Sequence, residues 1–161
     1  MRGEWEAGNN ELRTAIRLEP TNLLARREVA SLLLHGAENN LNEDRLREAI
    51  PHLQYLVDAN PNDRDAHYDL ATSFEYFHQW DSALTHYREL FRIGQTPEDM
   101  DVWVHMVQHD VARCLENLGR YEEALIEYQQ YLSVLEKMEA DTQTLWVVRN
   151  SIKRLMFRLK K

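Results

Sequence analysis

The stretch VARCLENLGRYEEALIEY, residues 111–128, decides the fold of this chain. Its first half places Ala112 and Leu115 on one helical face, because side chains three residues apart are neighbours on a helix. Its second half does the same with Ala124 and Tyr128, which are about one helical turn apart. A small residue in each helix lets the two helices approach closely. The stretch therefore predicts a pair of packed helices joined by a short turn.

The same pattern occurs along most of the chain. Ala83 lies 34 residues after Ala49 and 41 residues before Ala124, and a large side chain follows each of them four residues later. The helices that precede them carry matching stripes: Val29, Ala30 and Leu33; Leu70, Ala71 and Phe74; Val111, Ala112 and Leu115. Recurrence at this period is typical of a helical repeat array, which presents an extended surface. We therefore expect binding rather than catalysis.

Composition favours an all-α fold. The chain has 161 residues, 43% hydrophobic and 29% charged, with only five glycines and four prolines. So few helix breakers suit long helices better than the many tight turns of a β fold. The sequence has no apolar run of about 18 residues and no apolar core of a signal peptide at its start, so we expect a soluble, cytoplasmic protein. Cys114, the single cysteine, is expected to be buried and unreactive.

Charge is distributed unevenly along the sequence. Residues 1–140 contain 13 basic and 26 acidic side chains, whereas residues 141–161 contain six basic and one acidic. An acidic body repels phosphates and anionic lipid and attracts basic or neutral partners. We therefore expect no nucleic-acid partner and no membrane partner, although the basic tail from Arg149 to Lys161 leaves nucleic-acid binding as a remote alternative.

Residues 111–128 resemble the core of the tetratricopeptide repeat, a pair of antiparallel helices of about 34 residues. A second unit keeps the pattern with His78 where the motif favours glycine, and the resemblance covers about residues 3–135. It implies a right-handed α-α superhelix of helical hairpins with a C-terminal capping helix. Within a single domain, residues 1–161, we expect a half repeat at 3–20 (second helix only), repeats at 23–63, 64–97 and 98–138, and a basic capping helix at 141–161.

Two insertions of seven residues depart from this motif. The first, around 35–42, is rich in Gly and Asn and is interpreted as a lengthened turn between the helices of repeat 1. The second, around 96–101, is interpreted as an early start of the first helix of repeat 3. Surface decoration is the simplest explanation for both, and the first loop is a candidate contact.

The two ends of the array differ. Trp5 and Leu12 align with a second helix whose first helix is missing, which indicates either a domain cut from a longer array, which we favour, or a self-association surface. A natural short start is the third alternative. At the other end, Leu145, Val148, Ile152, Leu155 and Leu159 form an apolar stripe interleaved with basic residues. This helix is expected to cap the array with a polar outer face.

The resemblance implies that the first helix of each hairpin lines a concave groove. The middle of this groove is acidic and aromatic, which suits a peptide or helix bearing Arg or Lys; a merely solvated acidic face is the alternative. The groove residues expected to bind the partner are Arg27, Asp65, Tyr68, Asp69, Thr72, Tyr76, Met106, His109, Asp110, Arg113 and Trp146. Chaperone-binding members use a clamp of Lys, Asn and Arg, and here only Arg27 keeps the required charge, so an acidic chaperone tail is disfavoured.

Catalysis has little support. His105 and His109 are one helical turn apart beside Asp110, but a third metal ligand would have to come from elsewhere. No phosphate-binding loop or nucleophile motif is present. We therefore expect no enzyme activity, metal or cofactor. The predicted function is a non-enzymatic protein-protein interaction module, with self-association through Trp5 and Leu12, as a homodimer or on missing repeats, as the alternative.

Overall fold

The computed structural model describes residues 2–35, 42–94 and 102–160, and the side chains of residues 2–7, 9, 35 and 102–106 are not described. The described residues form eight α-helices joined by turns, which confirms the predicted all-α class. The chain divides into two compact units, residues 1–73 and residues 74–161.

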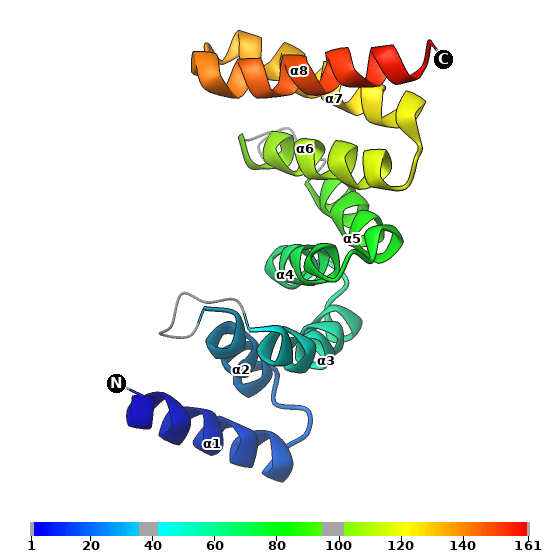
Figure 1. Ribbon diagram of the computed structural model, residues 1–161. Helices are drawn as coiled ribbons and strands as arrows, with labels where there is room; N and C mark the ends of the chain where they lie inside the picture. Colours follow the sequence, from blue (N-terminus) through cyan, green and yellow to red (C-terminus); the bar gives the residue numbers. More distant parts are fainter. Residues whose placement is uncertain (1, 36–41, 95–101, 161) are drawn as a thin grey trace. The chain divides into compact units, whose positions relative to one another are not determined.

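The first unit is a set of helices packed in sequence order. It contains α1 (Arg2–Leu18), α2 (Leu23–His35), α3 (Glu43–Ala59) and most of α4 (Arg64–Tyr76), with α1 packed on α2 and α2 packed on α3 (Figure 1). Its core contains the predicted stripe residues, which are at most 4% exposed: Val29, Ala30, Leu33, Ala49, Leu53, Leu70 and Ala71. The recurring small and large residues therefore do form the packing faces that the sequence predicts.

Polar side chains set where the helices of this unit begin. Asn22 accepts a hydrogen bond of 2.9 Å from the backbone N–H of Ala25 before α2. Asn42 accepts one of 2.9 Å from Asp44 before α3, and Asp63 accepts one of 3.2 Å from Ala66 before α4. Each side chain satisfies a backbone donor that has no partner within the first turn of the helix.

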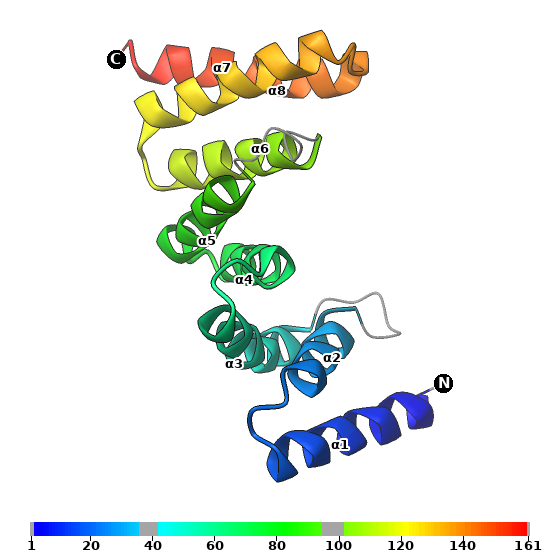
Figure 2. The ribbon, with the colours of Figure 1, turned by 180° about the vertical axis from the view of Figure 1, so that it is seen from behind.

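The second unit continues with α5 (Trp80–Ile93), α6 (Val102–Asn117), α7 (Tyr121–Lys137) and α8 (Thr142–Arg158). Each of these helices packs on the next, and α7 and α8 lie side by side from both directions of view (Figures 1 and 2). The core again contains the predicted residues, which are at most 2% exposed: Ala83, Tyr87, Val111, Ala112, Leu115, Ala124, Tyr128, Val148 and Leu155.

Three helix ends in this unit have the same type of turn. His78, Gly119 and Glu139 have positive φ values of 57°, 75° and 53°. The backbone N–H after each donates to a carbonyl five residues earlier, for example from Arg120 to Leu115 at 2.9 Å. This is the Schellman motif, which favours glycine at the left-handed residue because glycine has no Cβ. His78, which stands where the repeat motif favours glycine, therefore occupies the same left-handed position as Gly119.

Some sequence expectations fall outside the described residues. Most of the lengthened turn expected around 35–42 and all of the insertion around 96–101 are among them, and the described part of α6 begins at Val102. The repeat boundaries stay predictions. The expectation of a polar outer face on the last helix is wrong in part. Trp146 and Phe157 of α8 are each 65% exposed, because α8 buries only the face that packs on α7.

Candidate functional site

Arg27, the predicted groove residue of α2, is held by Asp63. Its guanidinium donates to both carboxylate oxygens, and Nη1 lies 3.4 Å from Oδ1. Asp63 is buried and also begins α4. This hydrogen-bonded pair, with the negative charges of Asp65 and Asp69 nearby, raises the pKa of Arg27. Arg27 therefore connects α2 to the start of α4 while part of its side chain stays accessible to solvent.

The predicted groove residues of α4 form an acidic and aromatic surface. Asp65 is exposed, and Tyr68, Asp69 and Thr72 are half-buried. Asp65, Asp69 and Thr72 follow one another at spacings of four and three residues, so they share one helical face. The Thr72 hydroxyl donates to backbone carbonyls of its own helix at 3.1 Å. The carboxylates can accept hydrogen bonds from Arg or Lys, and the tyrosine ring can pack against the aliphatic part of the same side chain.

Arg113 is the centre of a polar cluster in the second unit. It forms ion pairs with Glu75 and, at 3.5 Å, with Asp110. Glu75 also accepts a hydrogen bond of 2.8 Å from the hydroxyl of the buried Tyr87. Burial acts against the charge of Arg113, but the carboxylates outweigh this effect and raise its pKa. The cluster therefore holds α6 against the end of α4.

His109 lies next to this cluster. The centroid of its ring lies 5.7 Å from that of Tyr128 and 5.6 Å from that of Tyr131. Its Nδ1 atom lies 3.7 Å from a carboxylate oxygen of Asp110. In the described part of the chain, no group of three or more His, Cys, Asp or Glu side chains could hold a metal ion. The side chain of His105 lies outside the described residues.

A polar hollow of about 530 Å³ opens in the second unit between α6, α7 and α8. It includes the predicted residues His109 and Arg113, and is further lined by Glu116, Asn117, Tyr121, Tyr128, Val147, Ser151, Arg154 and Arg158. Arg154 binds Glu116 through two hydrogen bonds of 3.0 and 2.8 Å. Arg158 donates to the Tyr121 hydroxyl at 2.9 Å. The hollow thus offers arginine and aromatic side chains together.

Sequence reasoning missed the ion pairs of this hollow, although the sequence contains a signal for them. The pair formed by Arg113 and Glu75 recurs 41 residues later as Arg154 and Glu116. The repeat spacing therefore applies to polar residues as well as to the core, and aligning the repeats would have shown that this arginine and this glutamate recur together.

The other predicted residues are not part of these clusters. Tyr76 is 39% exposed and packs edge-on against Phe77, and Trp146 is exposed on α8. Leu12 is half-buried on α1, whereas the side chains of Trp5 and Met106 lie outside the described residues. Self-association through Trp5 and Leu12 stays a prediction. Within the described ranges, no helix has both the length and the apolar composition needed to cross a bilayer.

Comparison of the chain with known protein families gives one match. The model of the tetratricopeptide repeat family matches residues 37–90 and 68–137, which together span more than half of the chain. No curated protein matches the chain significantly.

Several solved structures are similar to the chain in fold. A Podosopora anserina putative kinesin light chain with nearly identical TPR-like repeats is 16% identical with a TM-score of 0.68, over 96% of this chain and 78% of that chain. The structure of MamA MSR-1 C2 is 18% identical with a TM-score of 0.64, over 86% and 71%. A thermophilic TPR protein in Thermus thermophilus is 17% identical with a TM-score of 0.52, over 96% and 74%. At these identities the likeness shows the fold alone.

Proposed function

Because this chain belongs to the tetratricopeptide repeat family, whose members are generally protein-protein interaction modules, we propose that it binds a basic peptide or helix of a partner protein. The contact lies on the face of α4 that carries Asp65, Tyr68 and Asp69. Family members are typically non-enzymatic scaffolds, so binding needs no chemistry from these residues.

The observation that carries this proposal is the charge of the α4 face. The hydrogen bond with Asp63 is the main cause of the raised pKa of Arg27, and the charges of Asp65 and Asp69 contribute to it. Residues 64–72 of α4 contain these two carboxylates and one basic residue, Arg64, so this part of the helix carries a net negative charge although Arg27 is bound to the buried Asp63. Such a surface increases the association rate of a cationic partner and selects against an anionic one.

Tyr68 contributes the apolar part of the proposed contact. It is half-buried, so its ring is already partly ordered before any partner arrives. An aromatic anchor of this kind loses little side-chain freedom on binding, and truncating such an anchor commonly costs about 2 kcal/mol or more of binding free energy. The remaining proposed contacts are those with which the second unit would touch a partner: Tyr76, Met106, His109, Asp110, Arg113 and Trp146.

Fluorescence anisotropy with a labelled peptide of alternating arginine and leucine tests this proposal. Asp65→Asn combined with Asp69→Asn should weaken binding by about tenfold or more, because each substitution keeps the side-chain shape and removes one charge. Asp58→Asn is the matched control, since Asp58 is an exposed carboxylate at the end of α3. Equal weakening by the control, or equal binding of a glutamate-leucine peptide, would show that this face is not the site.

A further inference from the structure

The outer face of α8 combines exposed aromatic side chains with positive charge. Trp146 and Phe157 are each 65% exposed, and Met156 is 45% exposed. The opposite face, with Val148 and Leu155, is buried against the rest of the second unit. Large aromatic side chains that are exposed to solvent mark an interaction site when they occur together rather than singly.

Trp146 and Phe157 lie on one line along α8, together with three polar residues. Trp146, Asn150, Lys153, Phe157 and Lys160 follow one another at spacings of four, three, four and three residues. Residues at this spacing form a continuous ridge on one side of an α-helix, and a ridge of this kind is the surface against which a second helix packs. Trp146 and Phe157 are about 16 Å apart along the axis, which is enough for about three turns of a partner helix.

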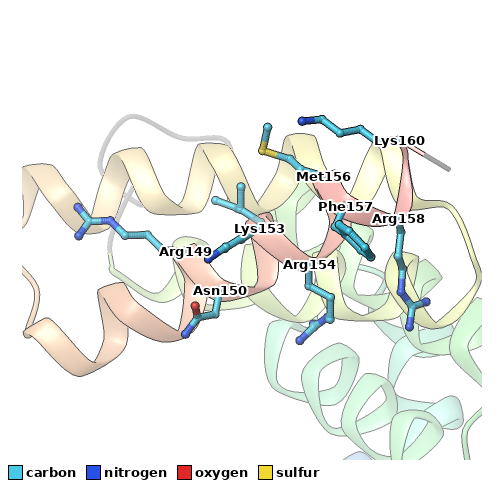
Figure 3. A pocket seen from close by; sticks show the side chains of 9 residues that line it. Arg149, Asn150, Lys153, Arg154, Met156, Phe157, Arg158 and Lys160 are labelled. Carbon is cyan, nitrogen blue, oxygen red and sulfur yellow. The ribbon is translucent and has the colours of Figure 1, made fainter.

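The ridge borders a hollow along the last turns of α8. Figure 3 shows Met156 and Lys160 at one edge of this surface and Arg154 and Arg158 at the other, with Lys153 and Phe157 between them. Phe157 thus lies within a surface that is bordered by Met156 and by basic side chains.

The charge of α8 indicates which kind of partner this face would bind. Residues 142–161 contain no Asp or Glu and six Lys or Arg. Arg149 and Arg154 are ion-paired with Glu136 and Glu116 of the same unit. Among the described residues, Lys153 and Lys160 form no ion pair, so their charges are available to an anionic partner.

We propose that the outer face of α8 binds an amphipathic helix of a partner protein that carries Asp or Glu beside its apolar residues. Its apolar side chains pack on Trp146 and Phe157, and a carboxylate pairs with Lys153 between these two rings. This surface prefers acidic partners, whereas the proposed surface on α4 prefers basic ones. Trp146 is the one residue named as a contact in both proposals, and the substitutions that test them do not overlap, so either proposal can fail without affecting the other.

A protein helix fits this face better than a lipid surface does. Lys153 lies between the two aromatic rings on the same ridge, so inserting both rings into a bilayer would bring its ammonium toward the acyl chains. A carboxylate from a helix can instead reach that position directly.

A labelled helical peptide of about 18 residues, with leucines at alternating four- and three-residue spacing and glutamates between them, tests this inference by fluorescence anisotropy. We expect the peptide to bind, to bind less tightly as salt is added, and to lose at least about tenfold in affinity with Lys153→Glu. Phe157→Ala should cause a similar loss and leave the fold intact, because the ring is exposed. Lys137→Glu is the matched control, since it reverses the same charge on an exposed lysine at the end of α7.

Five outcomes would overturn the inference. The acidic peptide fails to bind, or a lysine-leucine peptide of the same pattern binds equally well. The control Lys137→Glu weakens binding as much as Lys153→Glu, which would reduce the effect to net charge. Phosphatidylserine vesicles bind through Phe157 while the peptide does not. Light scattering shows a dimer that Phe157→Ala abolishes, in which case a second copy of this chain covers the face.

Discussion

Replacing Gly119 by alanine should lower the free energy of unfolding by about 1 kcal/mol. Gly119 has a φ of +75°, and a Cβ built on it would have no atom within 4 Å. The cost is therefore conformational and contains no steric clash. The left-handed conformation costs an L-residue about 1–2 kcal/mol, and alanine recovers about 0.4–1 kcal/mol by restricting the unfolded chain. For a chain of this length, about 1 kcal/mol corresponds to a fall in Tm of about 2–4 °C.

The same turn supplies a reciprocal test at Glu139. This residue has a φ of +53° and occupies the position of Gly119 in an equivalent hydrogen-bonded turn. Glu139→Gly should therefore raise the free energy of unfolding by about 1 kcal/mol, whereas the control Glu139→Ala should change it little. Urea unfolding followed by far-UV circular dichroism measures all three variants. If Gly119→Ala is neutral, or if Glu139→Ala stabilises as much as Glu139→Gly, backbone conformation does not determine stability at these turns.

Two further predictions concern titratable side chains. Burial, followed by the charges of Arg26 and Arg13, lowers the pKa of His52, so the folded state favours the neutral form of this side chain. The free energy of unfolding should therefore fall as the pH drops below about 6.5, where the unfolded chain takes up the proton more readily. Urea titrations at a series of pH values should show this dependence, and His52→Leu should make it weaker. An unchanged dependence would exclude His52 as its source. Burial, together with the charge of Glu75, raises the pKa of the Cys114 thiol to about 12, so iodoacetamide should label it slowly in the native protein and rapidly in urea, as measured by mass spectrometry. Rapid labelling of the folded chain would contradict this.

The packing faces could be predicted from the sequence because they obey a local rule. Ala49, Ala83 and Ala124 all have 0% exposure, and each sits where two helices of a hairpin need a small side chain. The large side chains Leu53, Tyr87 and Tyr128 follow one turn later and are at most 2% exposed. Helical periodicity alone decides which residues share such a face, so no knowledge of tertiary structure is needed.

The polar contacts could not be predicted in this way. Arg27 and Asp63 are 36 residues apart, and Arg154 and Glu116 are 38 residues apart. Periodicity places these residues on a face but does not say which residue of another helix lies opposite. On α8, the predicted apolar stripe with Val148 and Leu155 does identify the buried face, but the same periodicity gave no sign that Trp146 and Phe157 would be exposed on the other side.

Net charge is a poor guide to partner chemistry in this chain, because basic residues are concentrated in one helix. The chain has a formal net charge of −8, yet residues 142–161 contain six Lys or Arg and no Asp or Glu. The acidic composition of the whole chain therefore does not make the surface of α8 acidic. The two proposed surfaces should consequently respond to opposite substitutions. Lys153→Glu should leave the arginine-leucine peptide bound, and the double substitution of Asp65 and Asp69 should leave the glutamate-leucine helix bound. If either variant weakened both peptides, overall charge rather than a defined surface would control binding.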